Sequence, residues 1–263
     1  MQKPLVCVTL RGGTAEEMSN DASKAIEMGA DLVEARLDFL WTREERIFND
    51  SNSEEVGRKE VEVVVKQMDL GDVDVEESIK TISSAVTIPI LFTCRPQRQG
   101  GFYPGSEEER LSVLELAIAS KPDWIDLEGD ISSPEREDLT KLAQNDSRII
   151  ASYHHLERVP SASEISQDVI DFQEFGDIVK VCYSTNDRKD ALRIFESAME
   201  LNSSDINYSL MGVGPGGDWP RIHAPALGQD IVFATTESGW HLAQQGKINA
   251  SDLRIAWEIL EYV

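Results

Sequence analysis

The sequence predicts an α/β protein folded as a closed (β/α)₈ barrel, the TIM-barrel architecture, and three observations support this. The chain has 263 residues of which 41% are hydrophobic, enough for one large domain. Eight short apolar runs, mostly β-branched, are typical of parallel strands buried on both faces. Most runs start roughly 22–35 residues apart, about the length of one strand-plus-helix unit. An open doubly wound sheet is the alternative.

The expected elements follow in chain order. The eight predicted strands span residues 5–10, 31–37, 88–94, 123–128, 148–154, 177–183, 206–212 and 230–236. Helix-period patterns such as 15–29 and 188–201 lie between them. At 29–31, 121–123 and 175–177 a glycine or proline stops the helix and an aspartate leads into the strand. This repeated punctuation indicates alternating helices and strands.

One interval departs from the repeat. About 50 residues separate the second and third runs, and segment 42–78 is strongly acidic with a valine patch at 63–65. We expect a helix with an extended, solvated connection here. We interpret the segment as an acidic insertion between barrel strands 2 and 3, so that residues 1–263 form a single domain.

The charge balance limits the partners of the chain. Its 25 Lys and Arg against 48 Asp and Glu give a net charge of −23. Such an excess disfavours nucleic-acid phosphate and anionic membrane surfaces, which both need a cationic face. The charge also exceeds the magnitude of roughly 2–8 that suffices for solubility in a small domain. We interpret it as halophilic adaptation to a salt-rich cytoplasm, with an ordinary acidic surface as the alternative.

The expected location is cytoplasmic. The first apolar run is too short and too closely followed by Arg11 for a signal peptide, and no uncharged stretch approaches the ~18–20 residues of a membrane span. Cys7, Cys94 and Cys182 are an odd number, lie far apart and occur within apolar runs. A disulfide framework is therefore not expected.

No motif for a cofactor or metal is evident. The glycine-rich segment 212–219 lacks both the Lys-Ser/Thr of a P-loop and the spacing of a dinucleotide fingerprint. The histidines at 154, 155, 223 and 241 offer no metal-binding helical pair, and no CxxC occurs. We expect neither a metal nor an organic cofactor.

Ionisable residues at the strand ends indicate where chemistry takes place, because barrel enzymes react where strands end and βα loops begin. The second run carries Glu34 and Arg36 two residues apart, so both point toward the barrel mouth. The third run ends at Arg95, and the fifth ends at His154 and His155. These positions are the candidate site.

Lys180 is the sharpest signal, because it lies in the middle of the apolar strand 177–183. Burial disfavours an ammonium and lowers its pKa, which would leave a neutral amine able to form an imine with a carbonyl. The alternative is a lysine paired with an interior carboxylate such as Asp126 or Glu128, and this residue by itself favours neither.

His154 lies one strand away from Lys180 and could take a carbon-bound proton that an imine has acidified. A structural histidine is the alternative. His154 and His155 face opposite sides of the strand, so at most one enters the barrel, and strand parity does not choose between them.

Four motifs together resemble a known family. They are EARLDFL (34–40), TCRPQRQGG (93–101), SYHHLERVP (152–160) and DIVKVCYS (177–184), and in this order they resemble type I 3-dehydroquinate dehydratase. That family is the Schiff-base dehydratase class of the shikimate pathway in aromatic amino acid biosynthesis. The resemblance extends from VTLRG (8–12) to SDLRIAWEIL (251–260).

The resemblance implies a lyase that converts a small-molecule substrate, 3-dehydroquinate, to 3-dehydroshikimate and water without a cofactor, and a homodimer. It implies that Lys180 forms the imine and that His154, not His155, is the general base and acid. It implies further substrate contacts from Thr9, Glu34, Arg36 and Arg95, a carboxylate contact from Arg221, and a contact from Gln245.

Two positions depart from the family pattern. Gln99 stands where many members have a glutamate in a T-x-R-x-x-x-E-G-G loop. Segment 241–247 replaces the usual S-A-P-G-Q, and alignment on its glycine places Lys247 at the substrate glutamine's position. A two-residue shift places Gln245 there, which we prefer on chemical grounds.

Two other functions use the same residues. A Schiff-base class I aldolase on the same barrel would share Lys180 and would need a phosphate site, for which segment 212–219 is the candidate. A catalytically inactive barrel acting as a binding protein would account for Gln99 and the altered C-terminal loop.

Overall fold

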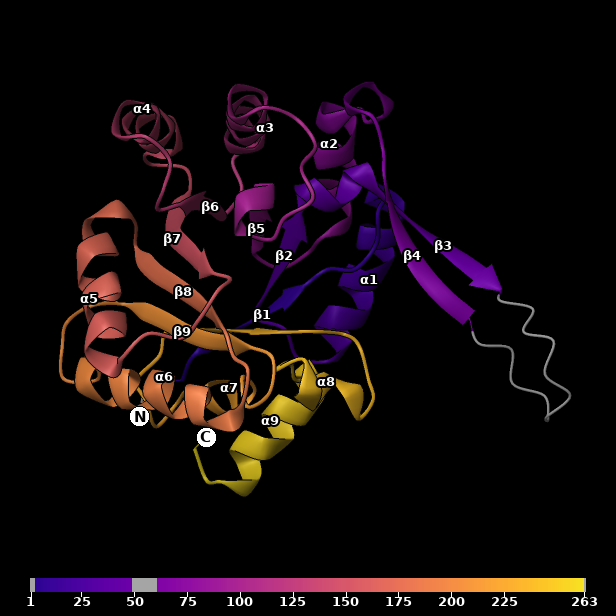
Figure 1. The fold of residues 1–263 in the computed structure, drawn as a ribbon. Coiled ribbons are helices and arrows are strands. Elements are labelled where there is room, and N and C mark those ends of the chain that lie inside the picture. Colours follow the sequence, from indigo (N-terminus) through magenta and orange to yellow (C-terminus); the bar gives the residue numbers. More distant parts are fainter. Residues whose placement is uncertain (1–2, 49–60, 263) are drawn as a thin grey trace, which may run out of the picture.

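The computed structural model describes residues 3–48 and 61–262, and its centre is an eight-stranded parallel sheet that curls into a nearly closed barrel (Figure 1). The strands are β1 (Leu5–Thr9), β2 (Leu32–Arg36), β5 (Ile90–Thr93), β6 (Trp124–Glu128), β7 (Arg148–His155), β8 (Ile178–Ser184), β9 (Tyr208–Val213) and β10 (Ile231–Ala234). They are hydrogen-bonded in the order β10-β1-β2-β5-β6-β7-β8-β9. Where β9 meets β10, the Asp230 N–H donates to the carbonyl of Tyr208 at 3.0 Å.

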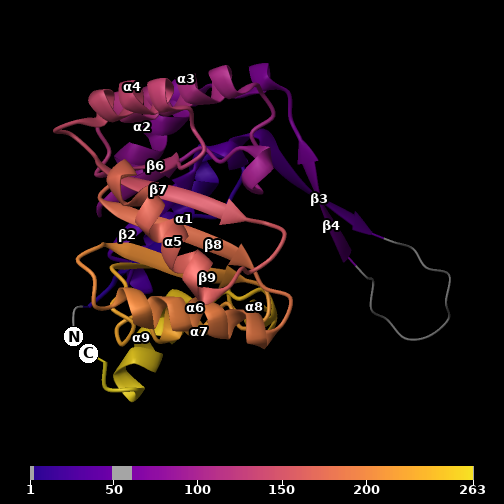
Figure 2. The same cartoon turned by 60° about the vertical axis from the view of Figure 1, so that its left-hand side comes forward.

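The helices lie outside the strands (Figures 1 and 2). They are α1 (Ala15–Glu27), α2 (Val75–Ala85), α3 (Glu107–Ala119), α4 (Ser133–Ala143), α5 (Ala162–Phe172), α6 (Arg188–Leu201), α7 (Trp219–Ile222), α8 (His241–Gln244) and α9 (Ala250–Ile259). Short 3₁₀ turns are η1 (Leu37–Trp41), η2 (Leu70–Asp72), η3 (Gln97–Gln99) and η4 (Gln173–Phe175). Ser106 and Ser161 begin α3 and α5 with capping boxes.

The predicted barrel and its eight strands are confirmed. Each apolar run overlaps one barrel strand, and the whole of β5 and β6 is buried, as expected where helices cover one face and the barrel interior the other. In the described residues, no helix combines the length and apolar character needed to cross a membrane.

The aspartates that punctuate the sequence hold the strand starts together. The carboxylate of Asp31 accepts from the N–H of Val6 at 2.7 Å, and that of Asp123 accepts from the N–H of Ile90 at 3.0 Å. Asp177 does the same for β7. Each carboxylate therefore satisfies a backbone donor at the end of the barrel where the strands begin.

The prediction of a helix was wrong for most of the insertion. Strands β3 (Thr42–Phe48) and β4 (Val61–Gln67) pair in antiparallel fashion and project from the barrel (Figure 2), and residues 49–60 lie outside the described part. The valine patch belongs to β4, with Val65 opposite Glu44. Consecutive β-branched residues favour a strand once a partner strand is available. The insertion does lie between barrel strands 2 and 3, and a helix, α2, begins at Val75.

The barrel interior contains an apolar cluster and a set of buried polar side chains. An apolar cluster is formed by Cys7, Leu32, Leu91, Trp124, Ile150, Ile178, Cys182, Met211, Ile231 and Phe233. Toward the carboxyl ends of the strands the buried side chains become polar, with Glu34, Asp126, Ser152 and Lys180 among them. All three cysteines are buried free thiols. These polar side chains place the candidate site at the mouth of the barrel that is formed by the carboxyl ends of the strands.

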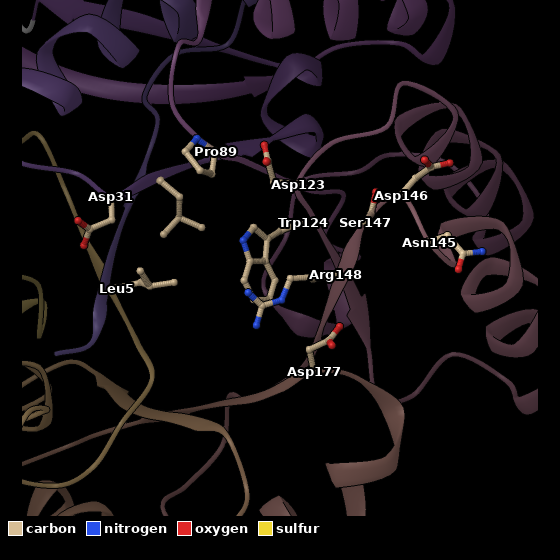
Figure 3. A pocket seen from close by; sticks show the side chains of 11 residues that line it. Leu5, Asp31, Pro89, Asp123, Trp124, Asn145, Asp146, Ser147, Arg148 and Asp177 are labelled. Atoms are coloured by element: carbon tan, nitrogen blue, oxygen red, sulfur yellow. The ribbon is translucent and has the colours of Figure 1, made fainter. Parts of the chain in front are cut away.

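A cavity of about 580 Å³ opens at the opposite end of the barrel, where the strands begin (Figure 3). Leu5, Trp124 and Arg148 line it at the starts of their strands, and the Arg148 guanidinium lies 4.1 Å from the centroid of the Trp124 ring. Its aspartates include Asp31 and Asp123, whose carboxylates hold backbone donors. This cavity is therefore separate from the candidate site.

Candidate active site

Lys180 lies inside the barrel between two carboxylates. Its Nζ is 3.5 Å from Glu34 Oε1 and 3.6 Å from Asp126 Oδ2, and the side chain is 3% exposed. It also lies 3.6 Å from the centroid of the Phe233 ring. Both carboxylate oxygens lie within ion-pair distance of this nitrogen. The predicted alternative, a pair with Asp126, is present, whereas Glu128 pairs with Arg110 at 2.7 Å and Arg95 at 3.7 Å.

Glu34 is a buried carboxylate that is contacted by cationic side chains and by two threonine hydroxyls. Burial by itself raises the pKa of its carboxyl, but the charges of Lys180 and Arg36 outweigh burial and lower the pKa to about 2. The hydroxyls of Thr9 and Thr93 donate to its two oxygens at 2.6 and 2.9 Å. Glu34 is therefore ionised at neutral pH and fixed in orientation by two donors.

His154 lies beside Arg95 and Gln99. Its Nε2 is 2.5 Å from Arg95 Nη1, its backbone N–H donates to Gln99 Oε1 at 3.0 Å, and its Nδ1 is 3.4 Å from the same oxygen. Burial first, and then the charges of Arg95 and Lys180, hold the pKa of the imidazole well below its ordinary value. The ring is therefore neutral at pH 7 and available as a base.

His155 faces the opposite side of β7. Its ring stacks on Tyr183 with 4.9 Å between centroids, and its Nε2 lies 3.1 Å from a carboxylate oxygen of Asp168 on α5. Tyr183 donates to the same oxygen at 2.8 Å. The structure thus places His154 inside and His155 against the outer helix, the arrangement that the resemblance implies.

Arg95 and Asp126 connect the histidine to the lysine. The Arg95 Nη2 donates to Asp126 Oδ2 at 3.0 Å, and the same carboxylate oxygen lies 3.6 Å from Lys180 Nζ. Ser152 also donates to Asp126. His154, Arg95, Asp126 and Lys180 are thus one connected group, although they come from three strands and one loop.

Asp38 is a functional candidate that the sequence reasoning missed. Its fully buried carboxylate accepts from Arg36 Nε and Nη2 at 2.7 and 2.6 Å. It also accepts from the backbone N–H groups of Arg95 at 3.1 Å and Phe102 at 3.0 Å. Asp38 therefore ties a predicted substrate-binding arginine to both ends of the loop that carries Gln99. Its place in the E-A-R-L-D motif was the available signal.

Arg221 is buried and directs its donors to backbone carbonyls. Nε donates to Phe233 at 3.0 Å, and Nη1 donates to Gly212 at 2.7 Å and Gly246 at 2.5 Å. The carbonyls of the glycine-rich segment 212–219 thus help to bind a guanidinium, which does not favour the phosphate site that an aldolase would need. The role of Arg221 in holding a carboxylate stays a prediction.

The C-terminal loop is held mainly by its backbone and by Glu237. The carbonyl of Gln245 accepts from the N–H of Gly214 at 3.0 Å, while its side chain is exposed. Lys247 Nζ lies 4.0 Å from Glu237, which also binds Arg11 at 3.1 Å. The structure brings Thr9, Glu34, Arg36, Arg95, His154 and Lys180 together but does not place Gln245 in this group.

Comparisons with known proteins agree with the geometry. Residues 6–262 match the family model for type I 3-dehydroquinase. A 3-dehydroquinate dehydratase of Methanothermobacter thermautotrophicus is 28% identical over 234 residues, covering 89% of this chain and 88% of that protein. A chloroplastic bifunctional 3-dehydroquinate dehydratase/shikimate dehydrogenase of Arabidopsis thaliana is 30% identical over 235 residues. The chain matches 34% of the length of that bifunctional protein, with 89% of its own residues.

Solved structures support the fold. A type I 3-dehydroquinate dehydratase from Clostridium difficile, with covalently modified comenic acid, has a TM-score of 0.80 and 20% identity, covering 99% of this chain and 93% of that one. A 3-dehydroquinate dehydratase from Geobacillus kaustophilus has a TM-score of 0.78 and 22% identity, covering 98% and 91%.

Proposed function

The chain belongs to the type I 3-dehydroquinase family and dehydrates 3-dehydroquinate, and we propose that Lys180 carries the reaction by forming an imine with the substrate ketone. The observation that supports this role is the position of Lys180, buried within the barrel and linked through Asp126 and Arg95 to the neutral ring of His154. An amine and a base at one end of a barrel are what an imine-assisted elimination requires.

The reaction proceeds in balanced steps. Once Lys180 has lost its ammonium proton, Nζ adds to the ketone carbon and water leaves, giving an iminium. His154 then takes a proton from the adjacent carbon, and the electron pair forms an enamine. The enamine expels the β-hydroxyl, which His154 protonates as it leaves, and positioned acid–base catalysis of this kind is typically worth about 10²–10⁴-fold. Hydrolysis of the imine releases 3-dehydroshikimate and restores the amine.

Arg95 must move before His154 can act. In the free protein its guanidinium occupies the Nε2 lone pair, and a nitrogen that already accepts a hydrogen bond is not free to take a carbon-bound proton. A substrate hydroxyl or carboxylate that binds Arg95 would draw it away from the ring. Substrate binding and release of the base are therefore coupled in this proposal.

The cationic side chains supply local binding in an acidic protein. A net charge of −23 repels a substrate carboxylate at long range. Arg36 and Arg95 lie at the mouth, and Arg221 lies near β10. A guanidinium can hold a carboxylate with two parallel hydrogen bonds, so these residues are the proposed counter-charges, with Arg221 as the carboxylate partner.

We also propose a salt-adapted origin, a cytoplasmic location and a homodimer. The acidic excess supports the first, because high ionic strength screens the self-repulsion of a surface of this charge. The sequence and the family resemblance support the other two.

Reductive trapping tests the imine directly. Borohydride added with 3-dehydroquinate should attach ligand mass to the peptide that contains Lys180. Lys180→Met, which replaces the amine with an unbranched side chain one atom shorter, should abolish both trapping and the appearance of the enone absorbance. Lys141→Met, at an exposed lysine of α4, is the matched control and should retain both. Labelling at another lysine, or turnover by Lys180→Met at low or molar salt, would refute the assignment.

A further inference from the structure

Gln99 is buried at 3% exposure and lies against the backbone and the ring of His154. We propose that Gln99 is a positioning residue that fixes His154 as the neutral tautomer with the proton on Nδ1 and the lone pair on Nε2. This inference rests on the proposed role of His154 as the base, but the tautomer itself does not depend on that role.

The orientation of the Gln99 amide follows from its neighbours. The backbone N–H of His154 can only donate, so the group 3.0 Å from it must be the amide oxygen. A reversed amide would set two donors against each other. In the described part of the chain the Gln99 Nε2 atom has no hydrogen-bond partner, so the orientation of the amide rests on the His154 N–H.

The tautomer follows from the amide. Because Gln99 Oε1 has no proton to give, a ring nitrogen that contacts it at 3.4 Å must be the donor, and that nitrogen is Nδ1. The other nitrogen faces Arg95, whose guanidinium is also a donor only. Two neighbours, one an acceptor and one a donor, thus specify the same protonation pattern independently.

The neutral amide also sets the basicity of the ring. The charged and titratable groups around His154 are Arg95 after β5, Lys180 on β8, Arg36 on β2 and His155 on β7, with Asp126 of β6 connected through Arg95. Cys182 of β8 is the cross-strand partner of His154. Gln99 adds no charge to this set, so it orients the imidazole without stabilising an imidazolium. A carboxylate at this position would do both.

Nitrogen NMR of the free enzyme tests the tautomer without turnover. In protein labelled with ¹⁵N-histidine, the signals missing from the His154→Gln variant identify this ring among the four histidines. We expect at pH 7 a protonated Nδ1 and an unprotonated Nε2. Protonation on Nε2, or on both nitrogens, would overturn the inference. Full activity of His154→Gln would instead refute the proposed function and leave the tautomer measurement standing.

Two substitutions test the consequence for catalysis. Gln99→Glu keeps an acceptor and adds a negative charge next to the ring, so the acidic limb of kcat/KM should move upward by about one to three pH units. Gln97→Glu makes the same change two residues away, on an exposed side chain of the same turn, and should leave that limb in place. Gln99→Met removes the acceptor and should lower kcat about 10–100-fold while KM changes little. Unchanged kcat in Gln99→Met, or equal limbs in the two glutamate variants, would contradict the proposal.

Discussion

Glu34→Gln should change the acid stability of the protein by an amount that the site geometry determines. Glu34 has a pKa of about 2 in the folded protein against an ordinary 4.5, because Lys180, Arg36 and other donors outweigh its burial. A lowered folded-state pKa contributes stability that is present above pH 4.5 and is lost as the pH falls toward 2. At 1.36 kcal/mol for each pKa unit, ionised Glu34 contributes about 3 kcal/mol at pH 7.

Urea unfolding at several pH values measures this contribution. Between pH 7 and pH 3 the wild type should lose about 2 kcal/mol from Glu34, whereas Glu34→Gln loses none from this position. The difference in unfolding free energy between the two proteins should narrow by that amount. Glu115→Gln, at an exposed position of α3, is the control and should differ from wild type by the same small amount at every pH. A constant difference for Glu34→Gln would refute the ion-pair reasoning.

One further substitution and one change of salt concentration give measurable outcomes. Asp38→Asn sets an amide against the Arg36 guanidinium and should raise KM about 10-fold or more, since a charge-assisted bidentate contact is lost. The control Asp138→Asn, at an exposed position of α4, should leave KM unchanged. Equal KM values for the two variants would show that Asp38 does not belong to the site. The thermal midpoint of unfolding should rise between dilute buffer and molar KCl if the charge of −23 is an adaptation to salt, and a flat response would show that it is incidental.

The insertion shows where local sequence patterns fail. The barrel strands were predictable because each must be apolar on both faces, so that every run is visible without knowledge of its neighbours. Strands β3 and β4 lie outside the barrel and are defined by their pairing with each other, as in the contact of Glu44 with Val65. Pairing between two separate segments leaves no periodic signal in either one, so segment 42–78 was predicted to be a helix with an extended connection.

The surroundings of Lys180 show the same limit at the site. Its position within an apolar strand predicted burial, and burial predicted a neutral amine. The structure adds Glu34 and Asp126, from strands far away in the chain, at 3.5 and 3.6 Å. Coulomb energy falls with distance, so the strength of these contacts depends on separations of a few ångströms that the sequence does not contain.

The sequence by itself determined the barrel, its strands and the burial of Lys180, because apolar runs and their spacing are local properties of the chain. Only the tertiary structure decided which histidine enters the barrel, that Asp38 joins Arg36 to the loop of Gln99, and that Arg221 is held by carbonyls. These facts depend on side-chain direction and on hydrogen bonds between residues tens of positions apart, which are fixed when the strands close into a barrel.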